Sequence, residues 1–314
     1  MRSVPDDYCP AGSARWFQIP SGHDAGKTIF YYDHVIGDGA PLRLIALDHV
    51  GFGASDQATF EMVDMHHSDN LRQLVAHLDL RQVTLVIHDW GGPIGIGAFE
   101  EAMDRVTSLV VLNSTIFPMP DDGITYANWP WSRLPWSEFP SVVPDSVWGG
   151  AAAGVVLDAF PAPIPVMLAK SMLYQMRFAV RSFRRHSPLW VFSESLRSKA
   201  NARSSKRNVF QTPVWGHGYT YSDPVVGEQD NRKYYRSMQA SLPARWGRAG
   251  ANIPVAGHFG DWDPCGKDSV IRQWQEALPS MRERTYVYPG FGHFIEEYKG
   301  AEIAASILEL NELK

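Results

Sequence analysis

Residues 83–92 read Val83-Thr-Leu-Val-Ile-His-Asp-Trp-Gly-Gly92, and this stretch decides the fold. It opens with an unbroken apolar or β-branched run, which predicts a strand buried on both faces, as in a parallel sheet. Asp89 and two glycines follow, and residues 93–103 then have helical spacing. A strand, one reactive residue on a tight turn, glycines and a helix form a nucleophile elbow. The alternative is that Asp89 has only a structural role, because Asp is also a favoured helix N-cap.

The composition limits the class of protein. A chain of 314 residues with 45% hydrophobic and 20% charged residues can bury a full globular core. The net charge of −5 gives no basic character that would favour nucleic acid as a partner. Cys9 and Cys265 lie far apart in the sequence, so they predict neither a disulfide framework nor a metal site. No signal peptide or membrane-spanning run stands out, and we expect a cytoplasmic protein without membrane contact or cofactor.

Strands and helices alternate around the elbow. The pattern predicts a hairpin of strands over 15–19 and 28–35, a strand over 42–47, a helix over 64–78 and a strand over 107–112. After residue 250 it predicts a strand over 253–259, a helix over 267–278, a strand over 284–288 and a helix over 301–313. This alternation is typical of an α/β fold with a mostly parallel sheet flanked by helices.

The pattern changes between residues 117 and 250. Residues 117–150 are dense in Pro and Trp, residues 151–200 have helical spacing, residues 201–232 have the composition of a long loop, and residues 233–246 suggest a further helix. We interpret 117–250 as a mainly helical cap domain. It would be inserted into an α/β core formed by residues 1–116 and 251–314.

Three chemically capable side chains follow three predicted strands, in the order Asp89, Asp263, His293. Catalytic groups of open α/β sheets gather at the carboxyl ends of the strands. Nucleophile, acid and histidine is also the chain order of α/β-hydrolases. Each residue alone has a structural alternative: Asp263 could serve only a turn, with Asp261 as a competitor, and His293 could be a core or capping residue.

With these motifs, the chain resembles the haloalkane dehalogenases within the α/β-hydrolase superfamily. The resemblance covers residues 42–115 and 253–313, and it is carried by His88-Asp89-Trp90-Gly91-Gly92-Pro93. Asn113 stands where one branch of that family has its catalytic Glu. The resemblance therefore implies that the acid follows the later strand, where Gly260-Asp-Trp-Asp263-Pro264 supplies it.

The resemblance implies a reaction in two steps. Asp89 would displace halide from an sp3 carbon and form an alkyl ester. His293, oriented by Asp263, would then activate water against that ester. Trp90 would hold the departing halide through its indole N–H. The partners would be a small apolar halogenated substrate, water and the halide product, with no cofactor or metal.

An epoxide hydrolase is the alternative enzyme, because that family resembles the same elbow. Its alkoxide leaving group takes a proton from two cap tyrosines, and this chain offers Tyr174, Tyr219, Tyr221, Tyr234 and Tyr235. Ile87, at a position where epoxide hydrolases usually have Gly, favours the dehalogenase, as does the Gly-Gly-Pro run after Trp90. A serine esterase is disfavoured, since the chain has no Gly-x-Ser-x-Gly.

One family motif is missing. Dehalogenases of this kind carry a His-Gly-Asn-Pro loop after the strand next to the elbow strand. This chain runs from Tyr31-Tyr-Asp-His-Val-Ile-Gly-Asp-Gly39 almost directly to Leu42. The family loop supplies an oxyanion-hole N–H and the Asn that helps Trp90 hold halide. Its loss keeps a third class open, a non-catalytic binding protein of this fold, although such a protein would need no triad.

Overall fold

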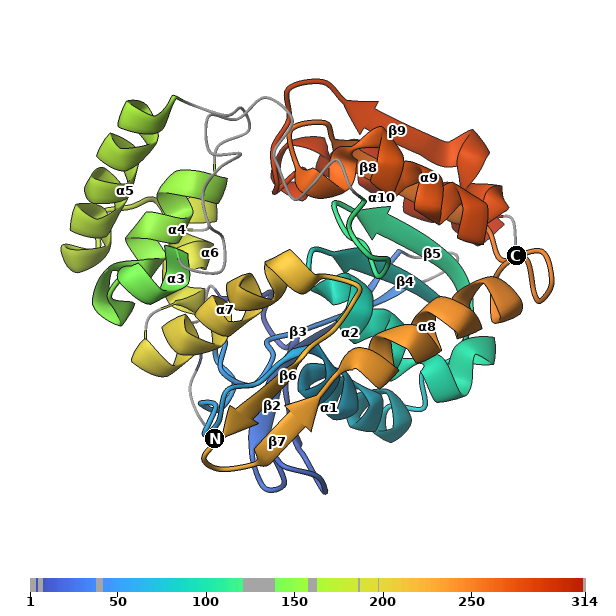
Figure 1. Ribbon diagram of the computed structural model, residues 1–314, viewed down its shortest axis with the longest axis horizontal. Helices are drawn as coiled ribbons and strands as arrows, with labels where there is room; N and C mark the ends of the chain where they lie inside the picture. The colour runs from blue at the N-terminus through green and yellow to red at the C-terminus, as the bar shows by residue number, and fades with distance from the viewer. Residues whose placement is uncertain are drawn as a thin grey trace.

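The computed structural model describes residues 4, 8–37, 42–120, 139–157, 163–185, 187–196 and 198–312. Its centre is a four-stranded parallel sheet in the order β4-β5-β8-β9 (Figure 1). The strands are β4 (Val83–His88), β5 (Val106–Leu112), β8 (Val255–Gly260) and β9 (Thr285–Tyr288). The predicted α/β fold with a parallel sheet and flanking helices is confirmed. Because all four strands run the same way, their carboxyl ends share one edge of the sheet.

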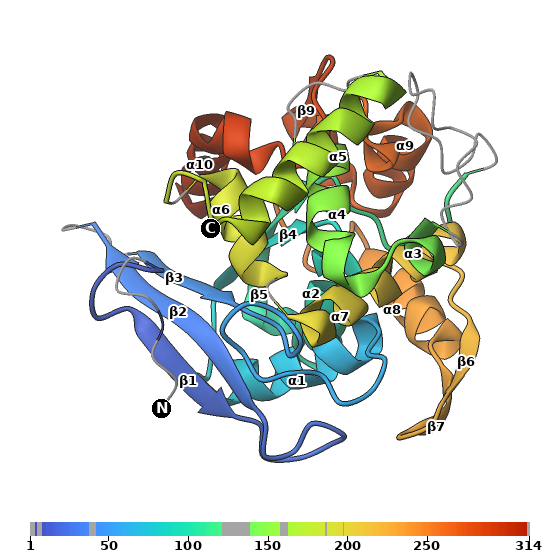
Figure 2. The same ribbon diagram turned by 90° about the vertical axis from the view of Figure 1, so that its left-hand side faces the viewer.

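A second sheet of three antiparallel strands contains β1 (Ala14–Gln18), β2 (Thr28–Ile36) and β3 (Leu42–Leu47) (Figure 2). The predicted hairpin of β1 and β2 is confirmed. The strand over 42–47 is also confirmed, but it pairs antiparallel with β2 instead of joining the parallel sheet. Ile36 lies opposite Leu42, and the connection is too short for the crossover that parallel pairing needs.

The prediction that residues 83–87 are buried on both faces is wrong. Ile87 is only 2% exposed and faces the core, but Val86 on the other face is 43% exposed. Among the described residues, β4 is an edge strand of its sheet. The helix α10 (Glu296–Glu312) covers that second face mainly over β5 and β8, so Val86 stays open to solvent.

The strand β5 shows how the core is divided. Leu109 and Val111 belong to a large cluster on one face, whereas Val110 and Leu112 pack with residues of α10 on the other. This alternation is the two-residue period of a strand covered on both sides. The large cluster takes apolar residues from α1 (Asp64–His77), α2 (Gly91–Ala98), α8 (Arg232–Arg245) and α9 (Asp268–Ala277).

The helix after the elbow is shorter than the predicted span of 93–103. The α-helix α2 ends at Ala98, and a 3₁₀ segment, η1 (Glu100–Arg105), follows with Ala102 outside helical geometry. Further 3₁₀ segments are η2 (Asp145–Val147), η3 (Thr212–Val214), η4 (Pro264–Gly266) and η5 (Pro279–Arg284). The predicted helices over 64–78, 267–278 and 301–313 are present as α1, α9 and α10.

Helices dominate the described part of residues 117–250, but the predicted loop over 201–232 is wrong in two places. The elements are α3 (Phe139–Val142), α4 (Trp148–Val156), α5 (Ile164–Ala179), α6 (Pro188–Ser195), α7 (Lys199–Gln211), β6 (Thr220–Asp223), β7 (Gly227–Asp230) and α8. Ser198 caps the start of α7 by accepting a hydrogen bond from the Asn201 backbone, and this helix ends at Gln211. Residues 220–230 then form an antiparallel hairpin.

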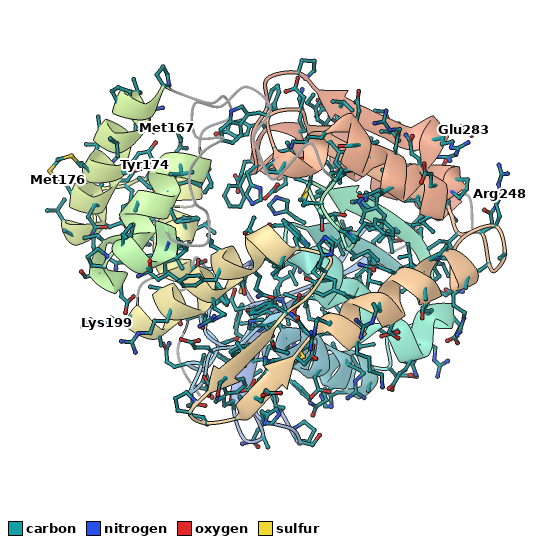
Figure 3. The ribbon with its side chains drawn as sticks, viewed as in Figure 1. Met167, Tyr174, Met176, Lys199, Arg248 and Glu283 are labelled. Atoms are coloured by element: carbon teal, nitrogen blue, oxygen red, sulfur yellow. The ribbon has the colours of Figure 1, made fainter. Side chains whose placement is uncertain are left out.

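The helices α4 and α5 pack closely, because Gly150 and Gly154 let α5 approach α4. Figure 3 shows Met176 on the outer side of α5, and Met172 is also exposed on that helix. Most of the stretch rich in Pro and Trp, residues 121–138, lies outside the described residues. No described helix has both the length and the apolar character needed to cross a membrane.

His67 is buried and the neighbouring His49 is partly buried, and most of their ring nitrogens have no hydrogen-bond partner among the described residues. The rings of His49 and His67 lie 5.0 Å apart. Among the described residues, neither nitrogen of His67 nor Nδ1 of His49 has a partner. Burial lowers the pKa of His49 to about 4. Burial, with the neighbouring His49 and His66, lowers the pKa of His67 well below its usual range.

These two histidines should make the fold sensitive to acid. Below about pH 6.5 the unfolded chain binds protons at these residues, whereas the folded chain binds them only at a lower pH, which is about 4 for His49. His49 should therefore remove about 2 kcal/mol of unfolding free energy between pH 7 and 5, and His67 should act in the same direction. We expect His67→Leu to lose less stability over this range than wild type, measured by urea unfolding. The exposed His77→Leu is the control, and an equal loss in all three proteins would contradict the prediction.

Candidate active site

Asp89 occupies a strained turn at the end of β4. Its φ is 50°, in the left-handed region that most residues avoid. The turn is held because the Ser114 hydroxyl donates to the Asp89 carbonyl at 2.6 Å and the Gly92 N–H donates to the same carbonyl at 3.1 Å. A Cβ at Gly92 would collide with the Ser114 hydroxyl, which explains the glycine at that position. This is the geometry of a nucleophile elbow.

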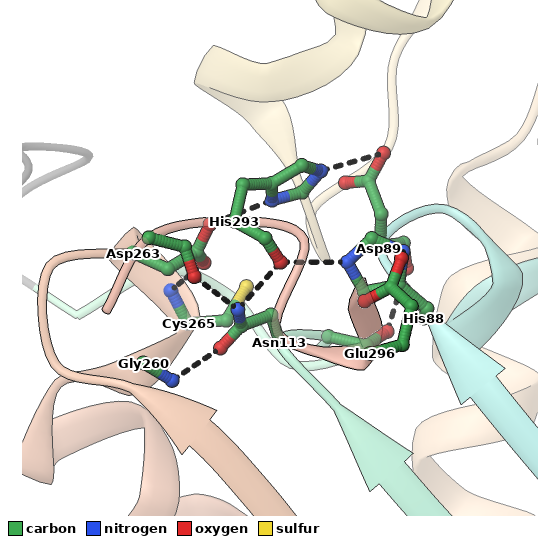
Figure 4. A network of polar contacts seen from close by, with 10 residues as sticks. His88, Asp89, Asn113, Gly260, Asp263, Cys265, His293 and Glu296 are labelled. Carbon is green, nitrogen blue, oxygen red and sulfur yellow. Dashed lines mark hydrogen bonds and ion pairs between the residues drawn. The ribbon is translucent and has the colours of Figure 1, made fainter. Parts of the chain in front are cut away.

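The structure brings Asp89, Asp263 and His293 together (Figure 4). Nδ1 of His293 lies 2.7 Å from Oδ2 of Asp263, and Nε2 of His293 lies 3.7 Å from Oδ2 of Asp89. The side chains become more accessible along this series: Asp263 is 3%, His293 14% and Asp89 32% exposed. A reactant can therefore reach Asp89, while Asp263 is hidden behind the imidazole.

Asp263 and Asp261 have different partners. Asp263 also accepts a hydrogen bond from the Cys265 backbone at 2.8 Å, which fixes its carboxylate at the start of η4. Asp261 accepts from the Gly290 backbone at 2.6 Å and so supports the loop that carries His293. Of the two candidate acids, Asp263 is the one that contacts the imidazole.

The charges of the site act on one another. Burial alone would raise the pKa of Asp89, but the His293 charge and hydrogen bond, the nearby His88 and the Trp90 backbone N–H bring it below its usual value. Burial would lower the pKa of His293, but the carboxylates of Asp89 and Asp263 hold it well above its usual range. At neutral pH the site therefore contains an ionised Asp89 facing a protonated His293.

The side chain of Trp90 is buried and fixed in place. Its ring stacks on Trp215, with centroids 4.3 Å apart and planes inclined by 19°. Trp215 is held in turn by an indole N–H that donates to the Thr115 carbonyl at 2.8 Å. No sequence pattern distinguishes Trp215 among the eleven tryptophans, because its contact with Trp90 is entirely tertiary.

Three of the five tyrosines considered for an epoxide hydrolase donate to acceptors other than Asp89, Asp263 and His293. The Tyr234 hydroxyl donates to the Pro93 carbonyl at 2.5 Å, Tyr235 donates to Asp64, and Tyr221 donates to the Glu61 carbonyl. Burial raises the pKa of Tyr234 and Tyr235 well above the usual value. These three hydroxyl groups serve the packing of α8 and the β6–β7 hairpin.

Sequence reasoning missed a set of polar side chains behind Asp89, Asp263 and His293. The main-chain carbonyl of His293 lies 2.7 Å from the Asn113 amide nitrogen and 3.0 Å from Nε2 of His88 (Figure 4). Nδ1 of His88 faces Oε1 of Glu296 at 3.6 Å. Asn113 is identified from the sequence only because it stands where one branch of the family has its catalytic Glu. No local pattern predicts its hydrogen bond to a distant loop.

The hairpin of β2 and β3 leaves no room in the chain for the family's strand and His-Gly-Asn-Pro loop between them. The Trp90 backbone N–H, one donor of the expected oxyanion hole, does bond to the Asp89 carboxylate. Residues 38–41, which include part of the Gly37-Asp-Gly39 turn, lie outside the described residues. Within the described part of the chain, no group of three or more His, Cys, Asp or Glu side chains could hold a metal ion.

The fold, the left-handed Asp89 turn and the match of residues 38–144 to the α/β hydrolase fold family define the class of protein, an α/β hydrolase. A haloalkane dehalogenase of Mycolicibacterium paratuberculosis is 40% identical over 278 residues, covering 85% of this chain and 73% of that protein. The chain therefore belongs to the haloalkane dehalogenase family of hydrolases.

A second relative agrees with this assignment, and a solved structure has the same fold. A haloalkane dehalogenase of Psychrobacter cryohalolentis is 29% identical over 227 residues, covering 69% of this chain and 68% of that protein. The structure of haloalkane dehalogenase DpaA from Paraglaciecola agarilytica has a TM-score of 0.60 at 15% identity, covering 93% of this chain and 91% of that one. At that identity the structural likeness supports the fold alone.

Proposed function

We propose that this chain is a haloalkane dehalogenase that uses Asp89 as its nucleophile, with His293 as the base and Asp263 as its partner. The observation that carries the proposal is the accessible Asp89 carboxylate on its strained turn, 3.7 Å from an imidazole whose other nitrogen contacts Asp263. The substrate class is a small apolar haloalkane, and the products are an alcohol, halide and a proton. The names of the relatives support the same reaction.

In the first step an Asp89 oxygen attacks the carbon that bears the halogen. The C–O bond forms as the C–halogen bond breaks, and the halogen leaves with the electron pair. The low pKa of Asp89 keeps this carboxylate ionised. The Trp90 indole N–H is the proposed donor to the departing halide, and stacking on Trp215 limits the reorganisation that this role costs.

In the second step, ester formation has removed the negative charge of Asp89, and this lowers the pKa of His293. Once Asp89 is an ester, only Asp263 remains to raise the pKa of the imidazole, so that pKa falls, and His293 releases its proton to solvent and can act as a base. Nε2 takes a proton from water, and the oxygen adds to the Asp89 carbonyl carbon. The imidazolium gives that proton to the alcohol oxygen as the ester C–O bond breaks, and the Asp89 carboxylic acid, which now holds one oxygen from water, passes its proton to His293 and restores the resting ion pair.

Epoxide hydrolysis is less well supported, because Tyr221, Tyr234 and Tyr235 donate to other acceptors.

We propose that the chain divides into a core of residues 1–116 and 251–314 and a cap of residues 117–250. The cap helix α8 packs on the core through Tyr235, Met238 and Leu242. We also propose that the protein is cytoplasmic.

The direct test combines halide release with isotope labelling. A panel of bromo- and chloroalkanes is assayed beside epoxides, and a single turnover is run in water enriched in oxygen-18. We expect halide release, and the heavy oxygen should enter the Asp89 carboxylate before it reaches the alcohol. Heavy oxygen in the first alcohol formed would contradict nucleophilic attack by Asp89. Diol formation from epoxides without halide release would favour the alternative enzyme.

The two steps should respond differently to pH. The alkylation rate should be nearly constant from about pH 5 to 8, because Asp89 keeps its charge throughout this range. Ester hydrolysis should slow as the pH falls, because the protonated His293 cannot accept a proton from water. Rapid mixing with 1-bromobutane, followed by intact-mass measurement, resolves both rates. Parallel pH profiles for the two steps would contradict the assigned roles.

A further inference from the structure

The side chain of His293 is the proposed base, but the contacts of its main chain need a separate explanation. This residue lies in the loop between β9 and α10, and loops are less rigid than the elements they connect. The reaction needs Nε2 at a fixed distance from Asp89, because misplacement by about 1 Å can cost about 10²-fold in rate. Contacts from other elements must therefore hold this loop in a fixed position relative to the Asp89 turn.

The first holding contact comes from Asn113, at the end of β5. Its amide nitrogen donates to the carbonyls of His293 at 2.7 Å and of Gly292 at 3.0 Å. Its amide oxygen accepts from the Gly260 N–H at 2.9 Å. Asn113 is fully buried and has a φ of 34°. The side-chain amide of Asn113 therefore links the ends of β5 and β8 to the loop that carries His293. Both its nitrogen and its oxygen take part in these hydrogen bonds.

The second contact comes from His88, the residue before Asp89. Its Nε2 lies 3.0 Å from the same His293 carbonyl, so this nitrogen must carry a proton to donate. Its ring also packs 4.6 Å from the His293 ring. Because His88 is covalently joined to Asp89, this contact links the position of the base directly to that of the nucleophile.

Glu296, in the first turn of α10, faces the other nitrogen of His88. Oε1 lies 3.6 Å from Nδ1, and among the described residues Oε2 is buried without a hydrogen-bond partner. The His293 carbonyl on one nitrogen of His88 and the Glu296 carboxylate on the other therefore fix the orientation of the imidazole from both sides.

We propose that Asn113 and His88 form a two-donor clamp on the main-chain carbonyl of His293, with Glu296 orienting His88. Asn113, His88 and Glu296 are positioning residues, because they act through His293 and need not touch substrate. The titratable groups that face His88 are Glu296 from α10, His293 from the preceding loop, and Asp89 from the elbow. The clamp deepens the proposed function, since its kinetic consequence rests on His293 acting as the base.

The kinetic test separates the two steps of the reaction. In His88→Leu we expect alkylation by 1-bromobutane to stay within about threefold of wild type, while ester decay slows by about 10²-fold. His88→Gln retains an N–H near the position of Nε2 and should recover most of the loss. Glu296→Gln should slow ester decay less than His88→Leu does. Controls are His77→Leu, exposed on α1, and Glu297→Gln, which neighbours Glu296; both should behave as wild type.

A second readout does not depend on turnover. The proton on Nδ1 of His293, held at 2.7 Å from Asp263, should give a strongly downfield resonance, assigned by its loss in His293→Gln. His88→Leu should broaden or shift that resonance, and His88→Gln should restore it. If wild type never becomes alkylated, the proposed function fails, and this resonance alone decides the clamp. An unchanged resonance in folded His88→Leu, or equal slowing of both chemical steps, would overturn the clamp. If His88→Leu does not fold, the comparison of Glu296→Gln with Glu297→Gln decides it.

Discussion

Replacement of Asp89 by Asn is expected to abolish halide release and leave the fold intact. The amide has nearly the same shape as the carboxylate but is a far weaker nucleophile. Asn also tolerates the left-handed conformation that this position requires, with φ at 50°. The loss should be at least about 10⁴-fold in halide release, which is typical when one member of a catalytic triad is removed.

The measurement is halide release from 1-bromobutane, with intact mass as a check that the amide has not deamidated to Asp. Asp261→Asn is the matched control, because that carboxylate supports the neighbouring loop without contacting His293. It should retain alkylation, even if the loop loosens. Turnover by Asp89→Asn at the wild-type rate, with its amide intact, would remove Asp89 from the role of nucleophile.

The second large effect is a burst of halide followed by slow turnover in the wild-type protein. The two steps develop negative charge in different places: on the halogen beside Trp90 in the first, and on the Asp89 carbonyl oxygen in the second. That oxygen has the Trp90 N–H as one donor, while the family loop that supplies the other is absent from this sequence. Loss of one oxyanion donor typically costs about 10²–10³-fold in rate.

Hydrolysis of the ester should therefore limit turnover, and alkylated Asp89 should accumulate. We expect about one halide per protein in the burst phase, which is the kinetic signature of a covalent intermediate. Intact-mass measurement after mixing with 1-bromobutane should show one alkyl group, and peptide mapping should locate it on Asp89. Fast steady turnover without an adduct would mean that another N–H fills the hole, with the Gly37-Asp-Gly39 turn as the first candidate. Neither halide nor adduct across the panel would favour a binding protein.

Local sequence was sufficient for the features that depend on neighbours in the chain. An apolar run before Asp89 and glycines after it predicted the strand, the turn and the helix, because strand propensity, left-handed turns and close helix approach are local properties. The positions of Asp263 and His293 after strands predicted their meeting, since the carboxyl ends of parallel strands share an edge. The structure places all three side chains together.

Tertiary structure alone decided which faces are covered and which groups hold the site. Val86 lies in an apolar run that predicts burial, but α10 lies mainly over β5 and β8, so Val86 stays exposed. β3 turned back onto β2 because the short connection forbids a crossover. Asn113 and His293 are separated by 180 residues, and no local pattern can specify a hydrogen bond over that distance. Sequence thus determined where the reactive groups stand along the chain, and packing between distant segments determined how they are held.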